Sequence, residues 1–185
     1  MKRKKLTASM IALVMSVSLP MTTYAANWYL EDGSVTVNAD NSGQTVTQGN
    51  GAAVPDEAPV ITQRESSVET GNTIAISTSD NAAANVTIKD INIKSSKDAI
   101  DVTGSSSANI TLEGDNKIFS ETGSALHVSD GNVTINGSGS LKAEIQDEPF
   151  GYNHNAKIGS HEKEDMSGSI HITGDATVKT DDNIA

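Results

Sequence analysis

The 185-residue sequence contains no cysteine, and only 3% of its residues are aromatic. Without cysteine the chain has no disulfide scaffold and no thiol chemistry. With 36% apolar residues and so few rings, the interior must be built from the small and branched side chains of Val, Ile, Leu and Ala. The length corresponds to one domain or at most two.

Positive charge is scarce beyond the first residues. The chain has 13 Lys and Arg against 24 Asp and Glu, a formal net charge of −11. Four of the basic residues lie within Lys2–Lys5, which leaves nine basic against 24 acidic residues, a net charge of −15, for the remainder. So acidic a surface repels phosphate backbones, and Arg64 is the only arginine outside the basic start. These features exclude nucleic acid as a partner.

The basic start is followed by an apolar stretch from Leu6 to Leu19, by Pro20 and by a run of small residues that ends at Ala26. This order predicts a secretory signal peptide over residues 1–26, cleaved after Ala25 or Ala26. A membrane-spanning helix needs about 20 apolar residues, so we expect no integral membrane segment after cleavage. A cysteine-free, acidic export product is typical of a bacterial protein that is secreted or held at the cell surface.

An apolar alternation repeats along the expected mature chain. Its four copies, whose starts are separated by 24, 23 and 37 residues, are Asn85–Ile88, Asn109–Leu112, Asn132–Ile135 and Ser169–Ile172. Gly114, Gly137 and Gly174 follow three of the copies at the same distance, and Asp90 takes this place in the first. Further apolar positions align behind the turn (Ile93, Ile118, Leu141, Val178) and in front of each copy (Ile74/Ile76, Ile100/Val102, Leu126/Val128, Ala156/Ile158).

Each period therefore contains about three short strands and several turns, without helical spacing. This pattern predicts an all-β fold, a right-handed parallel β-helix (a solenoid) with about 22–24 residues per coil. Apolar pairs such as Val86/Ile88 should stack inward, and Thr87 and its equivalents should form an outward ladder. An antiparallel sandwich is the rival fold, because regularly spaced strands with Gly and Asn turns would also suit it.

Two segments depart from the period. Residues 27–70 are expected to form an amino-terminal cap with irregular first coils that protect the open sheet edge. Residues 71–185 are expected to form the coils, with an inserted loop at 146–168. Because Asp182–Ala185 aligns with Lys97–Ile100, the approach to a third strand, we expect the β-helix to be incomplete at the C-terminus, as in a fragment of a larger surface protein.

The repeats resemble a known class of domain. The runs that carry the resemblance are Ala84–Ile93, Asp98–Val102, Asn109–Gly114 and Gly168–Gly174. They look like the right-handed β-helix domains of secreted Gram-positive surface proteins, which are described as carbohydrate-binding, pectate-lyase-like or adhesin repeats. The resemblance covers about residues 58–185. It implies a parallel β-helix and a polysaccharide or cell-wall glycan as partner.

The inserted loop holds the candidate glycan-binding residues Phe150, Tyr152 and His154. Sugar recognition uses an exposed aromatic platform flanked by polar groups. Packing of these rings against the solenoid is the alternative interpretation.

Acidic residues at the turns are candidate calcium ligands, since carboxylates stack along a β-helix and the acidic surface attracts divalent cations. Asp98, Asp101 and Asp115 are the first candidates, and the alternative is that they only keep the turns soluble. No other cofactor is expected. His154 and His161 with Glu162, Glu164 and Asp165 are a second group, but their spacing matches no tight zinc motif.

The sequence favours a non-enzymatic carbohydrate-binding or adhesive module. A polysaccharide lyase or glycoside hydrolase of the pectate-lyase-like type is the first alternative, and a purely structural stalk is the second. Glycoside hydrolysis needs two carboxylates across a sugar. Acidic residues are so abundant in this chain that no pair stands out.

Overall fold

The computed structural model describes residues 25–79, 81–146, 155–162, 164 and 167–180. Apart from one short 3₁₀ helix, η1 (Leu30–Asp32), the regular elements in this part of the chain are all β-strands. No helix in the described part of the chain is long and apolar enough to cross a membrane. The protein is therefore all-β, as expected.

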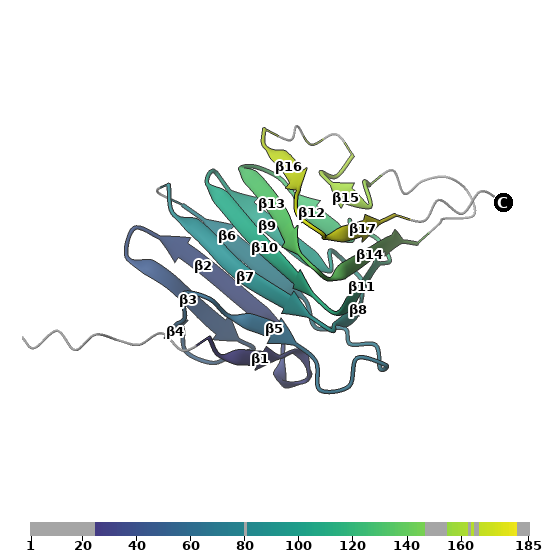
Figure 1. Cartoon of the computed structure of the whole chain (residues 1–185), viewed down its shortest axis with the longest axis horizontal. Coiled ribbons are helices and arrows are strands. Elements are labelled where there is room, and N and C mark those ends of the chain that lie inside the picture. The colour runs from purple at the N-terminus through teal and green to yellow at the C-terminus, as the bar shows by residue number, and fades with distance from the viewer. Residues whose placement is uncertain (1–24, 80, 147–154, 163, 165–166, 181–185) are drawn as a thin grey trace, which may run out of the picture.

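The strands form three sheets, which we name A, B and C (Figure 1). In spatial order, sheet A contains β1 (Asn27–Tyr29), β5 (Val60–Thr62), β7 (Ala83–Lys89), β10 (Ser107–Glu113), β13 (Asn132–Gly137) and β16 (Ser169–Ile172). Sheet B contains β15 (Ile158–Gly159), β12 (Leu126–Val128), β9 (Ile100–Gly104), β6 (Ile74–Thr78), β2 (Val35–Asp40), β3 (Gly43–Gln48) and β4 (Val54–Pro55). Sheet C contains β17 (Thr177–Lys179), β14 (Ser140–Ile145), β11 (Asp115–Ser120) and β8 (Asn92–Ser95).

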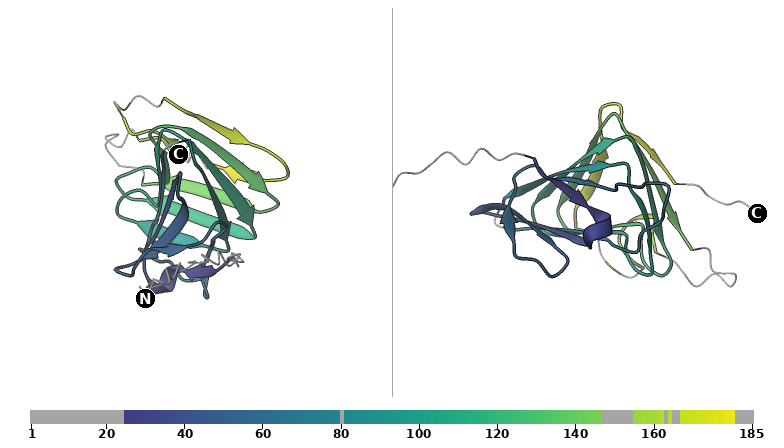
Figure 2. Two further views of the ribbon diagram at one scale, coloured as in Figure 1. Left: turned by 90° about the vertical axis from the view of Figure 1, so that its left-hand side faces the viewer. Right: turned by 90° about the horizontal axis from the view of Figure 1, so that it is seen from below.

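From β7 onward the chain visits the sheets in the fixed order A, C, B, so that each sheet gains one strand per period. All described strand pairs are parallel except β2–β3 and β3–β4. The predicted parallel stacking of the four repeat copies is confirmed, and the antiparallel sandwich is excluded. The three sheets surround a common interior (Figure 2), an arrangement compatible with a β-helix-like solenoid.

The predicted register is correct between β7 and β10, where Val86 pairs with Ile110. Between β10 and β13 it is wrong by two residues, because Ile110 pairs with Ile135 and not with Val133. A shift by two keeps every side chain on its own side of the sheet, so the apolar alternation is the same in both registers. The same shift occurs twice elsewhere: Leu141 pairs with Asn116 and not with Ile118, and Leu126 pairs with Ile158 and not with Ala156.

The interior consists of aliphatic stacks, as the composition required. Inward residues of neighbouring coils, such as Val35, Ile74, Ile100 and Leu126 in sheet B, are fully buried. Sheet C also buries the polar side chains of Ser95, Ser120 and Asn116. Asn116 is 1% exposed. Its side chain accepts the N–H of Ile91 and donates to the carbonyls of Glu113 and Ser140, so that it links three coils.

The corner after the first repeat copy explains why aspartate can replace glycine there. Asp90 has φ 49° and Gly114 has φ 62°, both in the left-handed region. Aspartate tolerates this region better than most residues because its short carboxylate bonds to nearby backbone. Here Asp90 Oδ1 accepts the N–H of Asp115 at 3.1 Å, in the next coil.

Buried polar side chains complete the amino-terminal edge of sheet A. The short strand β5 lies between β1 and β7 and covers only residues Thr87–Lys89 of β7. The side-chain amide of Gln44 takes the place of a strand beside Asn85. Gln44 Oε1 accepts the Asn85 N–H at 2.7 Å, and Nε2 donates to the Asn85 carbonyl at 3.1 Å. Asp56, only 2% exposed, accepts hydrogen bonds from Trp28 Nε1 at 2.8 Å and from the Ala26 N–H at 3.3 Å.

Several predictions fall outside the described residues. These are most of the signal peptide, Phe150, Tyr152 and His154 of the inserted loop, and the last five residues. The division into residues 1–26, 27–70 and 71–185 stays a prediction.

Candidate functional site

The outer face of sheet C carries a row of lysines. Its strands pair so that Lys117 of β11 lies beside Lys142 of β14, which lies beside Lys179 of β17. These side chains point outward because they alternate with the inward residues of the same strands. Neighbouring strands are about 4.8 Å apart, so the row extends for about 10 Å across the sheet. With Lys94, this face holds four of the nine basic residues that follow Ala26.

A groove of about 430 Å³ runs along this row, which we call the sheet C groove. Its polar lining includes Ser66, Asp115, Lys117, Ser140, Lys142 and Lys179. A smaller depression of about 260 Å³ adjoins it at Lys117 and is lined by Lys94, Phe119 and Glu144, among others. The face thus combines cations, hydroxyl groups and one aromatic ring.

The lysines of this face differ in their partners. Lys142 forms an ion pair with Glu144 at 3.0 Å, and Lys94 lies 3.9 Å from Glu69 and 5.6 Å from the centre of the Phe119 ring. Within the described residues, Lys117 and Lys179 have no carboxylate within 4.0 Å. The described lining of the groove thus carries three lysines against one carboxylate, a local excess of positive charge in an otherwise acidic protein.

The outer face of sheet A is built differently, from amides and hydroxyls that bond to each other between coils. Asn109 Nδ2 donates to Asn85 Oδ1 at 3.0 Å, and Thr111 Oγ1 donates to Asn136 Oδ1 at 3.0 Å. Ser169 Oγ donates to Asn132 Oδ1 at 2.8 Å. These side chains are already engaged in hydrogen bonds between neighbouring strands.

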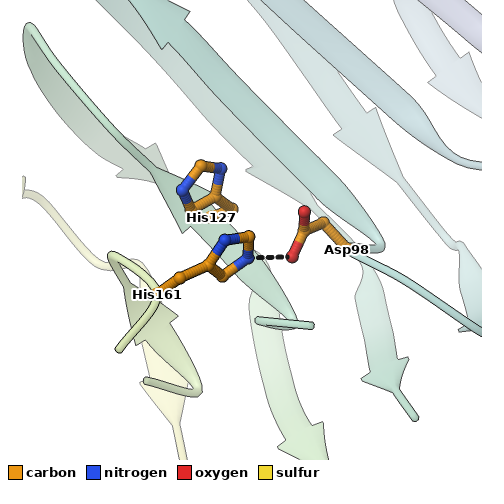
Figure 3. A group of neighbouring side chains, drawn as sticks. All are labelled: Asp98, His127 and His161. Carbon is orange, nitrogen blue, oxygen red and sulfur yellow. Dashed lines mark hydrogen bonds and ion pairs between the residues drawn. The ribbon is translucent and has the colours of Figure 1, made fainter. Parts of the chain in front are cut away.

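Two histidines and the carboxylate of Asp98 gather beside sheet B (Figure 3). His127, in the middle of β12, and His161, after β15, stack with ring centroids 4.0 Å apart and planes 11° apart. Asp98, just before β9, lies 2.7 Å from His161 Nε2. One ligand atom from each of Asp98, His127 and His161 lies within 4.8 Å of the other two.

Two further carboxylates hold the ring of His127. Asp101 Oδ1 is 2.7 Å from Nδ1, and Glu164 Oε2 is 2.8 Å from Nε2. The His127 side chain is only 8% exposed. Burial lowers its pKa, but the hydrogen bonds to Asp101 and Glu164 outweigh this, and the net result is a raised pKa. The bond to His127 in turn lowers the pKa of Glu164.

The structure brings together only some of the residues that were predicted as metal ligands. Asp98 and Asp101 lie in the histidine cluster, as do His161 and Glu164 from the second predicted group. Asp115 lies in sheet C, where its carboxylate accepts Ser140 Oγ at 2.8 Å.

Sequence reasoning missed His127 and the lysine row. His127 lies between Leu126 and Val128 in an apolar strand, and only its pairing with Asp101 of β9 reveals its partners. The lysines are far apart in the sequence and become neighbours only through the strand register.

The chain matches no family model, no curated protein and no solved structure. The function must therefore be argued from its own residues.

Proposed function

We propose that the chain is a right-handed parallel β-helix module, exported to the bacterial surface, that binds an anionic glycan along the sheet C groove. The cyclic order of the three sheets supports the solenoid. The row Lys117, Lys142 and Lys179 in register along a groove is the observation that carries the proposed function.

The geometry suits a linear polymer with a repeated negative charge. One lysine is presented per coil, and the spacing of about 4.8 Å between coils is comparable to the length of one sugar unit. Hydroxyl and amide groups in small-molecule sites fix the orientation of a polar ligand, and Ser66, Ser67 and Ser140 line this groove. A uronic-acid or other acidic polysaccharide therefore fits better than a neutral one.

Binding without turnover is the form of this proposal that the groove supports. Glycoside hydrolysis uses two carboxylates on either side of the sugar. The described lining of the sheet C groove contains one carboxylate, that of Asp115. The lyase or hydrolase remains the alternative, and product release from a polysaccharide panel would identify it.

The contacts at the amino-terminal end bear on which of the two expected cleavage sites is used during export. Cleavage after Ala25 would create a charged amino group at Ala26, whose nitrogen lies 3.3 Å from the buried carboxylate of Asp56. Cleavage after Ala26 would remove this contact. We therefore favour Ala26 as the first mature residue, and the intact mass of the exported protein decides between the two sites.

The test of glycan binding is calorimetric titration with polygalacturonate, a polyuronate, and with a neutral polysaccharide. The variant Lys117→Gln/Lys179→Gln should bind the polyuronate roughly 30-fold more weakly, taking about 1 kcal/mol per lysine at an anionic surface as a guide. Affinity should also fall with added salt. The unfolding midpoint should not change, because both side chains are exposed.

The matched control is Lys89→Gln/Lys97→Gln, which removes the same charge from other parts of the surface. It should bind the polyuronate nearly as well as the parent. Equal losses in the two double variants would show that only net charge matters. Absence of any saturable binding would leave the structural stalk as the better account.

A further inference from the structure

We propose that Asp98, His127 and His161, with Glu164 as a fourth ligand, bind one divalent transition-metal ion of the zinc class. The ligand atoms of the first three residues already lie within 4.8 Å of one another. Ligands that share one zinc ion are at most about 4 Å apart, since Zn–N and Zn–O distances are about 2.0–2.2 Å. Closing the site would take side-chain movements of about 1 Å and a rotation of one imidazole ring out of the stack, because a ring nitrogen binds a metal ion in the plane of its ring.

The fourth ligand is argued from the position of Glu164. Its Oε2 lies 2.8 Å from His127 Nε2 and 3.7 Å from His161 Nδ1. It thus approaches both rings from the segment that follows β15. A metal ion that binds His127 Nε2 would replace the proton that this nitrogen shares with Glu164.

Asp101 is the positioning residue. Metal-binding histidines usually bond through their second ring nitrogen to a carboxylate, which fixes the orientation of the ring. Asp101 Oδ1 lies 2.7 Å from His127 Nδ1 and so performs this role. The arrangement leaves His127 Nε2, which faces Glu164, as the nitrogen available to a metal ion.

The charges of the cluster also suit a divalent cation. Asp98, Asp101 and Glu164 provide three negative charges, and the two rings provide at most two positive ones. The cluster therefore has net negative charge in every ionisation state of the rings. One divalent ion with two neutral imidazoles gives the same net charge as two imidazolium rings, so metal can replace protons without new charge imbalance.

The donor set indicates the kind of metal. Imidazole nitrogen with carboxylate oxygen suits zinc, cobalt or nickel, whereas calcium takes oxygen ligands. Binding would tie the segment Asn155–Glu162 to β9 and β12, because His161 lies in that segment and Asp98 and His127 lie on the neighbouring coils. This inference does not depend on glycan binding.

The experiment is a titration of the tag-free, metal-stripped chain with Co²⁺, followed by its visible absorption, and with Zn²⁺ in competition. We expect one saturable ion per chain. His161→Gln, at a side chain that is 34% exposed and so tolerant of exchange, should weaken affinity at least tenfold. Asp101→Asn should weaken it by roughly 10- to 100-fold. Nitrogen-15 spectra of the imidazoles should show a changed His127 Nε2 signal in the loaded protein.

The matched control is His171→Gln, at an exposed residue of β16, which should bind like the parent. Circular dichroism establishes that each variant is folded. The proposal is overturned if His161→Gln and the parent give the same titration curve, or if no stoichiometric binding occurs. Tighter binding of Ca²⁺ than of Zn²⁺ would also overturn it, since it would indicate an all-oxygen site.

Discussion

The two ends of the described structure attach irregular segments to regular coils in different ways. At the amino-terminal end, Gln44 and Asp56 are buried and hydrogen-bond to backbone and indole groups. At the other end, the segment after β15 is held by His161 and Glu164 through contacts with Asp98 and His127. The first attachment uses fixed donors and acceptors, whereas the second uses groups that can exchange protons for a metal ion.

The difference predicts unequal responses to solution conditions. A neutral amide such as Gln44 holds its partners at any ordinary pH and in the presence of chelators. A cluster of imidazoles and carboxylates has a stability that depends on what it binds. The hydrogen bonds of Gln44 at the amino-terminal end should therefore form under all of these conditions. The segment around His161 should become more firmly attached when metal is present.

The largest expected effect is at the amino-terminal end. Asp56→Ala removes the acceptor of Trp28 Nε1 and of the Ala26 and Ala58 N–H groups. Loss of these three part-buried hydrogen bonds to a buried carboxylate should lower the free energy of unfolding by about 2–4 kcal/mol. Urea denaturation measures this, with Asp40→Ala, at an exposed residue of β2, as the control. If Asp56→Ala lowers the free energy of unfolding by less than Asp40→Ala does, the hydrogen bonds of Asp56 do not stabilise the amino-terminal end.

The second prediction compares hydrogen exchange at the two ends of the structure before and after zinc is added. Zinc at about 100 times its dissociation constant should stabilise the attached segment by at most about 2.7 kcal/mol, from the linkage of binding and folding. Hydrogen exchange should slow in 124–128 and 155–162 and remain unchanged in 27–62. Equal slowing at both ends would mean that the metal acts on the whole fold.

The smallest expected effect is a pH dependence at the amino-terminal end. Burial raises the pKa of Glu31, but bonds from the backbone N–H groups of Glu65 and Arg64 outweigh it, and the net pKa is lowered. The Arg64 guanidinium lowers the pKa of Asp32. Lowered carboxylate pKa values contribute stability that is present above the unfolded values and is lost as the pH falls through the folded ones.

Thermal unfolding should therefore show a slightly lower midpoint in acid, below about pH 4, and less of this change in Asp32→Asn. The effect is small because Arg64 and Asp32 are both exposed. An identical acid profile in the parent and in Asp32→Asn would show that the pair contributes nothing.

The sequence contained enough information for the parallel stacks but not for every register. Apolar alternation shows which side of a strand faces inward, and it placed Val86 beside Ile110 correctly. It cannot distinguish registers that differ by two residues, because both bury the same side. The alternation therefore predicts Val133 as the partner of Ile110, whereas the structure pairs Ile110 with Ile135.

The candidate sites were less predictable because they depend on that register. Asp98 and Asp101 could be selected as acids near a strand start, but nothing local indicates that His127 lies beside them. Similarly, Lys117, Lys142 and Lys179 are isolated residues in the sequence and form a row only when their strands pair. Sites formed by residues close together in the sequence can be predicted from the sequence. Sites formed by residues on several paired strands can be recognised only once the strand register is known.

The most direct test of the glycan-binding account is chemical-shift mapping on the nitrogen-15-labelled chain with a short oligogalacturonate. We predict that the perturbed amides cluster at 66–67, 115–117, 140–142 and 177–179, along the sheet C groove, and that the outer face of sheet A stays unchanged. Perturbations confined to sheet A, or to Phe150, Tyr152 and His154, with none in the sheet C groove, would contradict the account.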